Sequence, residues 1–346
     1  MKIRRRRRDC PHCEYSGFFV DGTLGINAGY TNGLKRLATR CCGFWSYRHA
    51  ADNLQEFCGI RLSYTTIGHL ASQTSDELTA KLSDHSDIRK SFQKAKGETE
   101  FSVDGTSVHI RNDEDQAEWR EMKVGVFAKR ECGESAAPSE WATRKLPKPT
   151  IMSAFAAIEN KEDFQERCQS ERRRLGVGGV SSALGDGALW IWNLVFRVFG
   201  KTAECLDIYH ALEHVAACGK ALYGSGPTFT DWLDRMRSVL LSEGFSGMDR
   251  ELSTVLSGAL QESEQESVVS LLNYLRKNSE RLPYGERLAS GRSIGSGQVE
   301  GACKNLVGRR LKQTGACWRL ERANRLALIC ALLYSNQWKQ AWKKTT

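Results

Sequence analysis

The stretch SALGDGALWIWNLVFRVFGKTAECLDIYHALEH, residues 182–214, decides the fold of this chain. It predicts a short buried strand at residues 182–185, a helix, a second strand at 204–208 and another helix. The first helix is apolar almost all round, which indicates that it is largely buried. Two strands joined by such a crossover form the unit of a parallel sheet, where ligands lie at the carboxyl ends of strands. Asp186 directly follows such an end and is therefore a candidate ligand-binding residue.

The residues on either side of this stretch predict the rest of an α/β fold with a mixed sheet. The pattern upstream predicts strands at residues 100–110, 119–129 and 150–158, an exposed polar loop at 130–149 and a charged helix at 161–175. The pattern downstream predicts helices over 212–277 with breaks near 224–227 and 244–247, a Gly- and Ser-rich loop at 284–297, and two amphipathic helices at 297–311 and 321–343.

The N-terminal part carries a basic arm and half of a metal-binding motif. Residues 1–30 contain the arginine run Arg4, Arg5, Arg6, Arg7 and Arg8, followed by Cys10 and Cys13 in a C-x-x-C pair. A closed tetrahedral Zn²⁺ site needs four ligands. The remaining ligands could come from Cys41, Cys42, His49 or Cys58, and unmetallated thiols are the alternative.

Residues 31–97 predict a small helical domain, with helices at 32–40, 46–57 and 63–82. Gly59 lies in the turn before the third helix, and Ser63 or Thr65 can cap that helix. This order is typical of a helix-turn-helix DNA-binding domain, and a plain three-helix bundle remains the alternative.

Composition and charge limit the classes of protein to consider. The chain has 346 residues, of which 40% are hydrophobic and 26% are charged, as in ordinary globular proteins. No apolar run approaches the ~20 residues that span a bilayer, and the N-terminus lacks a secretory signal, so we expect a cytoplasmic protein without a membrane partner. The net charge of +9 favours a polyanionic partner. Residues 287–325 hold nine basic and two acidic side chains, a net +7, whereas residues 226–286 hold six and ten, a net −4.

Three acidic residues lie in local sequence surroundings where a carboxylate is not expected from the predicted structure alone. Asp104 lies within a predicted strand, Asp186 lies between two glycines, and Glu300 lies in the first turn of a basic helix. Carboxylate oxygens are the ligands that Mg²⁺ prefers, and two such ions about 3.5–4 Å apart can stabilise a phosphoryl displacement. Glu300 by itself also fits a purely structural role, because a helix N-terminus favours a negative charge.

Four motifs in order resemble the ISKra group of insertion-sequence transposases, which belong to the DDE superfamily and are relatives of Mutator-like transposases. These motifs are DGT at Asp104, GDGAxWIW at Asp186, LDxYHAxEH at Asp207 and IGSGxVExACK around Glu300. The resemblance covers roughly residue 104 to the C-terminus, with a looser match at residues 10–26 and 62–66. Family members usually carry more chain before the C-x-x-C pair, so a truncated start is one interpretation of residues 1–30.

The resemblance implies a DNA transposase with an RNase H-like fold. Residues 98–210 and 286–346 would form the catalytic core, and residues 211–285 would form a helical insertion. Asp104, Asp186 and Glu300 would bind Mg²⁺ or Mn²⁺, with Asp207 and His210 in supporting roles and Zn²⁺ possible at the N-terminus. Lys304, Arg309, Arg310 and Lys312, together with the arginine arm, would contact DNA phosphates. The partners implied are the terminal inverted repeats and target DNA, bound by a homo-oligomer at the bacterial nucleoid.

Other interpretations compete with this one. His210, Glu213 and His214 fit the zinc-protease pattern H-x-x-E-H, and residues 291–295 fit the nucleophile pattern G-x-S-x-G without the buried strand that must precede it. Trp232 and Trp318 are candidates for stacking on unpaired bases, with core packing as the alternative. The competing functions are a structure-selective nuclease of the same fold and a catalytically inactive helix-turn-helix DNA-binding protein.

Overall fold

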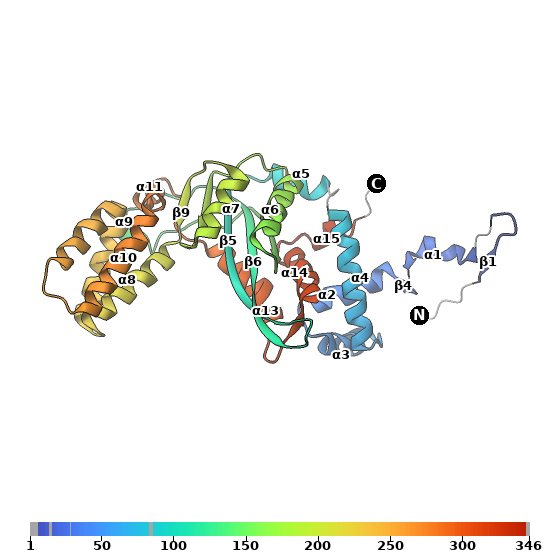
Figure 1. The fold of residues 1–346 in the computed structure, drawn as a ribbon. Coiled ribbons are helices and arrows are strands. Elements are labelled where there is room, and N and C mark those ends of the chain that lie inside the picture. The colour runs from blue at the N-terminus through green and yellow to red at the C-terminus, as the bar shows by residue number, and fades with distance from the viewer. Residues whose placement is uncertain (1–5, 14–15, 28, 83–85, 344–346) are drawn as a thin grey trace.

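A twisted mixed sheet occupies the middle of the molecule, with a helical lobe on one side of it and a helical bundle on the other (Figure 1). The structure is a computed structural model, and it describes residues 6–13, 16–27, 29–82 and 86–343. The N-terminal residues form two small hairpins that extend away from the bundle. No helix in these described ranges has both the length and the apolar character that crossing a membrane requires.

The sheet confirms the predicted mixed α/β order. Its strands lie in the order β7-β6-β5-β8-β9, with β6 antiparallel to β5 and β7, and with β8 and β9 parallel to β5. The strands are β5 (Glu98–Arg111), β6 (Ala117–Arg130), β7 (Ile151–Ala157), β8 (Ser182–Gly185) and β9 (Glu204–Leu206). A sixth strand, β10 (Trp318–Arg319), was not predicted and pairs in parallel with the end of β5. The last predicted strand ends two residues early, because Asp207 caps the next helix.

Aromatic side chains join one face of the sheet to two helices. Phe101 and Phe127 are paired across β5 and β6, and both rings contact Phe199 at the end of α7 (Leu189–Phe199). Phe155 on β7 packs against Phe164 of α6 (Lys161–Leu175), with 5.7 Å between ring centroids. Aromatic pairs at these separations stabilise a core beyond their buried area. Helices α6 and α7 therefore cover this face.

The C-terminal helices cover the opposite face. Helix α14 (Leu320–Tyr334) packs on β7 and on the N-terminal bundle. Side chains near both ends of α14 bond to the edge strand and the residue after it: Asn324 Oδ1, near the start of the helix, accepts from Ile158 N, and Ser335 Oγ, at its end, accepts from Ala154 N. The predicted single helix at 321–343 is instead two, because the chain turns at Asn336 with φ 54° before α15 (Trp338–Ala341).

Helix α7 is less buried than its composition predicted. Leu189 is 74% exposed and Phe196 is 65% exposed, although Ile191, Trp192 and Val195 are buried. The helix packs against α6 and, through Phe199, against the sheet, and Leu189 and Phe196 lie on its exposed side. Hydrophobic composition alone does not distinguish a helix packed on one side from one packed on all sides.

Helices fill the segment between β9 and the last acidic motif and form the lobe at the left of Figure 1. They are α8 (Ile208–Tyr223), α9 (Pro227–Leu256), α10 (Glu262–Lys277), the short 3₁₀ turn η2 (Ser279–Arg281) and α11 (Tyr284–Ala289). Two breaks fall where glycines predicted them, at residues 224–226 and at Gly244, whose φ is 59°. A third break, at residues 257–261 between α9 and α10, was not predicted. The expectation of a loop over residues 284–297 was wrong at its start, where α11 forms.

The loop between β6 and β7 is largely exposed, as predicted, and its backbone is also anchored to α11. It contains the short 3₁₀ turn η1 (Pro138–Glu140), and its backbone bonds to the end of α11 through Gly133 N to Gly291 O and Ala136 N to Leu288 O. Gly291 has φ 68°, and a Cβ there would lie 2.1 Å from Gly133 O. Only glycine permits this close approach.

The helix that carries Glu300 begins where it was predicted but contains an irregular turn. Residues Gly297–Ala302 form α12, Cys303–Gly308 form a π-helical segment, and Arg309–Leu311 form α13. Val299, Ala302, Leu306 and Val307 are buried, as the amphipathic pattern predicted. A π-helical turn inside an α-helix is rare and changes the direction of the side chains that follow it.

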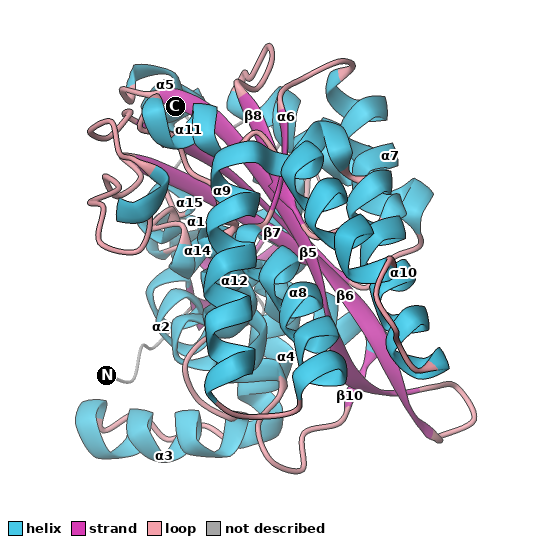
Figure 2. Ribbon diagram, turned by 90° about the vertical axis from the view of Figure 1, so that its left-hand side faces the viewer, coloured by secondary structure: helices cyan, strands magenta, loops and turns pink. Residues whose placement is uncertain are grey.

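Three helices form the N-terminal bundle, and all three lie where the sequence predicted helices: α2 (Asn32–Cys42), α3 (Tyr47–Cys58) and α4 (Tyr64–Leu82). A fourth helix, α5 (Ser86–Lys94), was not predicted and packs on α6 of the core. Thr31 and Ser46 cap α2 and α3 through side-chain oxygens. The bundle packs on the core through α4 and α14. Figure 2 shows α2, α3 and α4 on the side of the sheet that carries α14.

Arg310 joins the bundle to the core and is not a surface residue. It is 2% exposed, its Nε donates to Cys42 O at 2.6 Å, and its guanidinium lies 4.9 Å from the Trp318 ring centroid. Burial lowers the pKa of Arg310. The sequence-based prediction that Arg310 contacts DNA phosphates is therefore wrong, because its charge is enclosed between α2, Tyr47 and Trp318.

Adjacent arginines should differ sharply in their effect on stability. Arg310→Ala should lower the free energy of unfolding by about 3 kcal/mol, because Cys42 O loses a buried charged donor and a cavity forms. Arg309→Ala should change it by no more than about 0.5 kcal/mol, because Arg309 is exposed. Chemical denaturation of the two variants tests this pair. Equal stabilities would contradict the buried role of Arg310.

Candidate functional site

Three aspartates lie side by side across three adjacent parallel strands: Asp186 and Asp207 directly follow the carboxyl ends of β8 and β9, and Asp104 lies in the middle of the longer strand β5. The register pairs Ser102 of β5 with Leu184 of β8, so Asp104 and Asp186 stand at matching positions two residues further on. The register of β8 with β9 pairs Gly185 with Leu206, so Asp186 and Asp207 stand one residue further on. Neighbouring strands lie about 4.8 Å apart. The register therefore places Asp104, Asp186 and Asp207 next to one another on neighbouring strands.

Asp207 is fully buried, and it has two tasks. Its Oδ1 accepts from Tyr209 N at 2.7 Å and from His210 N at 3.1 Å, which caps helix α8. Its Oδ2 accepts from the backbone N–H of Ser296 and from Ser296 Oγ, the latter at 2.7 Å. Ser296 is the residue immediately before α12, the helix of Glu300. Asp207 thus ties the end of β9 to the start of that helix.

Glu300 belongs to a helix that lies beside Asp104. Cys303, one turn after Glu300, directs its Sγ to Asp104 Oδ2 at 3.8 Å. Burial and the charge of Asp104 raise the pKa of Cys303 to about 12, so Cys303 is a neutral thiol at pH 7. Glu300 Oε2 lies 3.6 Å from Lys304 Nζ, whose side chain is 78% exposed. An exposed ion pair of this kind is weak and can be exchanged for another partner.

The environment of Asp104 disfavours its charge. Burial is the main cause of a raised pKa at this carboxyl, and the negative charge of Asp186 adds to it. The Gly105 N–H, which donates to Oδ1 at 2.7 Å, opposes the shift only in part. Two carboxylates that repel each other on neighbouring strands form a site at which a bound cation would be favourable.

The residues present fit a hard divalent cation at the Asp104–Asp186 pair. Their oxygen donors and their mutual repulsion are what such an ion requires. Glu300 does not join them in this arrangement: in the described part of the chain, no group of three or more His, Cys, Asp or Glu side chains is placed to hold a metal ion. The sheet brings two of the three predicted ligands together, and the third side chain points to Lys304.

Two residues of the helical lobe lie near these aspartates, and the sequence patterns did not reveal one of them, Tyr274. Tyr274 of α10 packs over Gly187, where a Cβ would lie 2.5 Å from its ring, and it stacks on His214 at 3.8 Å between centroids. Burial and the nearby charge of Asp186 raise the pKa of Tyr274. His210 directs Nδ1 to Glu213 at 3.5 Å. Tyr274 was missed because nothing in its sequence surroundings links it to Asp186.

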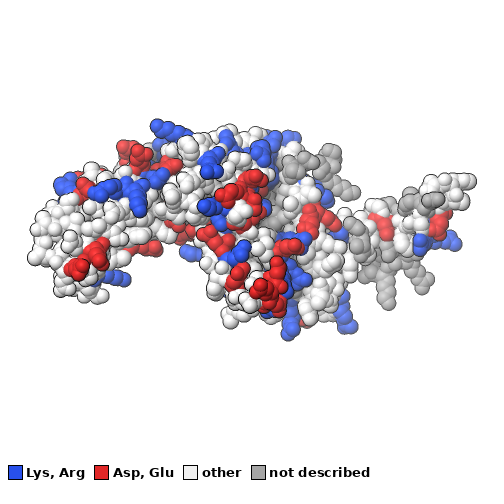
Figure 3. All heavy atoms as spheres, in the orientation of Figure 1, with Lys and Arg blue, Asp and Glu red and all other residues white. Residues whose placement is uncertain are grey.

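The predicted phosphate-binding residues divide into exposed and enclosed ones. Lys304 and Arg309 are exposed on the helical segment after Glu300, and Lys312, directly after that segment, is exposed and donates from Nζ to Thr106 Oγ1. Basic and acidic side chains alternate over the face seen in Figure 3. Much of the positive charge of residues 287–325 is paired, for example Arg319 with Asp115 and Arg325 with Asp76. Arg6, Arg7 and Arg8 are described, whereas Arg4 and Arg5 lie outside the described residues.

The predicted half zinc site lies in a small hairpin. Strands β1 (Arg8–Asp9) and β2 (Ser16–Gly17) pair, and Cys10 and Cys13 lie in the connection between them. Hydrogen bonds from backbone N–H groups and from Cys13 lower the pKa of Cys10. Cys42 is fully buried between helices, and burial raises its pKa to about 12, so it is not available as a ligand. Two described thiols do not by themselves make a closed zinc site.

The competing motifs have structural explanations. The His214 ring is stacked on Tyr274, and the H-x-x-E-H residues belong to no metal-binding group among the described residues. Ser293 is buried, donates to Gly295 O at 2.8 Å, and follows a turn rather than a strand. Trp318 donates its Nε1–H to Leu311 O and contacts Tyr47, and Trp232 packs against Tyr223. Both tryptophans therefore favour the packing interpretation.

Comparison with known proteins adds no assignment. No protein-family model matches this chain, and no curated protein matches it significantly.

Asp207 should be far more important for stability than an ordinary helix cap. Asp207→Ala should lower the free energy of unfolding by about 3 kcal/mol, because a cap and two charged hydrogen bonds are lost. Asn160→Ala, which removes the cap of α6, should cost about 1 kcal/mol. Asp207→Asn should keep the α8 cap while the Ser296 amide loses hydrogen-exchange protection. An Asp207→Ala variant no less stable than Asn160→Ala would contradict this role.

Asp104 should reduce stability at neutral pH. Its pKa is higher in the folded chain than in the unfolded chain, so stability falls as the pH rises through the folded pKa. Asp104→Asn should therefore raise the melting temperature at pH 7.5 in EDTA, and the gain should shrink at pH 4. Asp113→Asn, in an exposed turn, should show neither effect. Thermal unfolding at the two pH values makes the measurement, and a lower melting temperature for Asp104→Asn at pH 7.5 counts against it.

Proposed function

We propose that this chain is a DNA transposase of an insertion sequence that cuts and joins DNA by DDE-type phosphoryl transfer. One observation carries the proposal: the register of β5, β8 and β9 places Asp104, Asp186 and Asp207 at neighbouring positions, and Asp207 accepts a hydrogen bond from Ser296, the residue before the Glu300 helix. Three of the four motifs that resemble the ISKra group thus meet on neighbouring strands, and Asp207 holds the start of the fourth motif beside them.

The order of elements supports an RNase H-like core. Three antiparallel strands lead into two parallel ones, and helices interrupt the core between the Asp207 strand and the Glu300 helix. This is the arrangement that the resemblance implies, with α8–α11 as the insertion. Residues 226–286, within the proposed insertion, carry a net charge of −4, whereas the helix of Glu300 is basic.

In this proposal Asp104 and Asp186 hold Mg²⁺ or Mn²⁺, and Glu300 completes the site by leaving Lys304. The exposed Glu300–Lys304 pair is weak enough for that exchange. The bound ions would stabilise the negative charge on the attacking and leaving oxygens. The neutral Cys303 thiol beside Asp104 adds no further negative charge to the site.

The reaction has two displacements at phosphorus and needs no covalent enzyme intermediate. Water attacks the phosphodiester at the end of the element, its P–O3′ bond breaks, and a 3′-OH is released. That hydroxyl then attacks a target phosphodiester, and the target's own 3′ oxygen leaves with the proton. The chain's residues position the strands: Lys304, Arg309 and Lys312 bind phosphates next to Glu300, and the N-terminal helices bind the terminal inverted repeat.

The deciding experiment is cleavage of labelled DNA that carries the inverted repeats flanking the gene, with Mg²⁺ or Mn²⁺. Wild type should cut at the ends and join them to a target plasmid. Asp186→Asn should lose cutting by a factor of about 10³ or more, because a ligand that stabilises the transition-state charge is neutralised. Asp113→Asn should cut like wild type.

Each other outcome points elsewhere. Cutting without joining would favour a structure-selective nuclease, and binding without cutting in wild type would favour an inactive DNA-binding protein. Cutting that survives Asp186→Asn would remove Asp186 from the site.

A further inference from the structure

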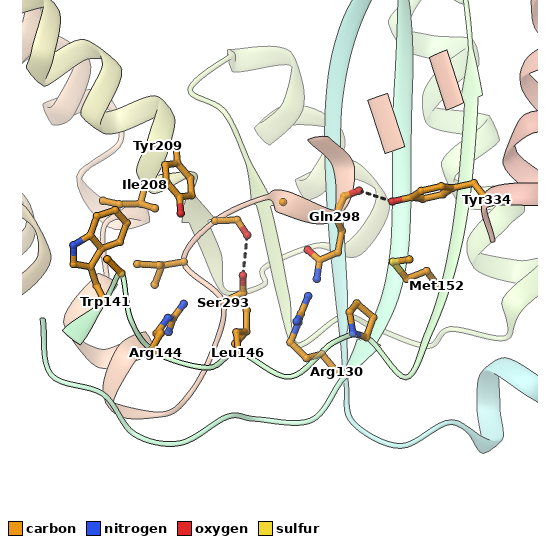
Figure 4. A pocket seen from close by; sticks show the side chains of 15 residues that line it. Arg130, Trp141, Arg144, Leu146, Met152, Ile208, Tyr209, Ser293, Gln298 and Tyr334 are labelled. Carbon is orange, nitrogen blue, oxygen red and sulfur yellow. Dashed lines mark hydrogen bonds between the residues drawn. The ribbon is translucent and has the colours of Figure 1, made fainter. Parts of the chain in front are cut away.

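A pocket of about 420 Å³ lies between the anchored β6–β7 loop, the start of α8 and the loop that leads to Glu300 (Figure 4). Its volume is within the range of about 300–1,000 Å³ that is usual for small-ligand sites. Gly295, Gly297 and Gln298 line it, so the segment that presents Glu300 also forms a wall of this pocket. None of the three acidic ligand candidates lines it.

The pocket holds a positive charge that no carboxylate balances. Arg130 is paired with buried Glu100 at 3.1 Å, so that charge is neutralised within the wall. Arg144 donates from one Nη to Arg292 O at 2.8 Å, and among the described residues no carboxylate lies within ion-pair distance of it. Burial and the nearby charges of Arg287 and Arg130 lower the pKa of Arg144. The guanidinium of Arg144 faces the pocket with donors available for an anion (Figure 4).

An unpaired acceptor and an aromatic surface complete the pocket. Gln298 is 7% exposed; its Nε2 donates to Glu100, whereas its Oε1 is buried without a hydrogen-bond partner among the described residues. In Figure 4 that oxygen points toward the pocket. Across from it, Trp141 and Tyr209 contact each other at 5.9 Å between centroids, and the Tyr209 hydroxyl points inward. A buried, unpaired carbonyl is unfavourable unless a ligand N–H reaches it.

We propose that this pocket binds one nucleotide of a DNA strand, with its phosphate on Arg144, its base against Trp141 and Tyr209, and a base N–H donated to Gln298 Oε1. An anion, a flat aromatic surface and an N–H donor occur together in a nucleotide, and every DNA base carries at least one N–H. A base stacked on an aromatic side chain contributes about 1–3 kcal/mol without regard to sequence. This inference rests on the proposed function for the identity of its strand, since the pocket shares its wall with the Glu300 segment.

A nucleotide held there would fix the strand next to the reacting phosphate. The Gly295–Gly297 loop lies between the pocket and Asp207, because Gly295 packs against Tyr209 and Asp207 while Ser296 bonds to Asp207. Binding in the pocket therefore acts on the same loop that positions Glu300. The residues involved here are positioning and binding residues, and none of them touches the reacting atoms.

The test is equilibrium binding to the full-length protein in EDTA, with three probes: dAMP, inorganic phosphate and a fluorescein-labelled single-stranded oligonucleotide. Wild type should bind dAMP more tightly than inorganic phosphate, and the oligonucleotide should displace dAMP. Arg144→Gln should weaken both anions about tenfold or more, because a charge-assisted contact is lost. Trp141→Leu should weaken dAMP about tenfold while leaving inorganic phosphate unchanged. The control Arg173→Gln makes the same change of charge at an exposed position of α6, and it should bind all three probes like wild type.

The outcomes separate the pocket from the catalytic proposal. Wild-type dAMP affinity in both Arg144→Gln and Trp141→Leu would overturn the pocket assignment. Binding of dAMP that the oligonucleotide does not displace would overturn the assignment to a DNA strand and indicate a free nucleotide. If the wild-type protein binds dAMP in an Arg144-dependent way but does not cut DNA, the pocket assignment holds and the transposase proposal is rejected.

Discussion

The buried carboxylate of Asp207 is the constraint on which the rest of the site depends. A buried charge is unfavourable unless it is paired or hydrogen-bonded, and four donors satisfy this one. Two donors belong to the first turn of α8, whose helix dipole also favours a negative charge there. The other two belong to Ser296. The chain leaves the sheet at Asp207, and after the helical lobe Ser296 bonds to the same carboxylate. One side chain therefore holds both ends of the lobe.

Because Ser296 is bonded to Asp207, the end of strand β9 determines where the helix of Glu300 begins. Helix α12 starts at the residue after Ser296, so its direction is set where β9 ends. Its neighbour Cys303 then meets Asp104, which returns the helix to the first strand. The Asp104–Asp186 pair is electrostatically unfavourable on its own, because the two carboxylates repel each other. Such a cost is typical of functional sites, where the arrangement serves a ligand rather than the stability of the fold.

The two neighbouring arginines Arg309 and Arg310 show how one helix can serve two surfaces. The π-helical segment before them changes the helical phase, so that Arg310 points inward to Cys42 and Tyr47 while Arg309 stays in solvent. Arg310 thereby ties the N-terminal bundle to the core. A similar division holds at the pocket, where Arg130 is neutralised by Glu100 and Arg144 is not. In both places the contacts of each guanidinium, and not its charge alone, determine its role.

The sequence by itself determined the class of fold, five of the six sheet strands, the helical character of residues 212–277 and the four acidic motifs. These are local properties: alternation and apolar runs set strands, glycines set breaks, and a carboxylate beside glycine after a strand marks a strand end. Only the tertiary structure decided that Arg310 is buried, that one face of α7 stays exposed, that the β6–β7 loop is anchored, and that Tyr274, Ser296 and Arg144 lie near the site. Each of these depends on a contact between segments far apart in the chain, and no local pattern records which distant residue will be the partner.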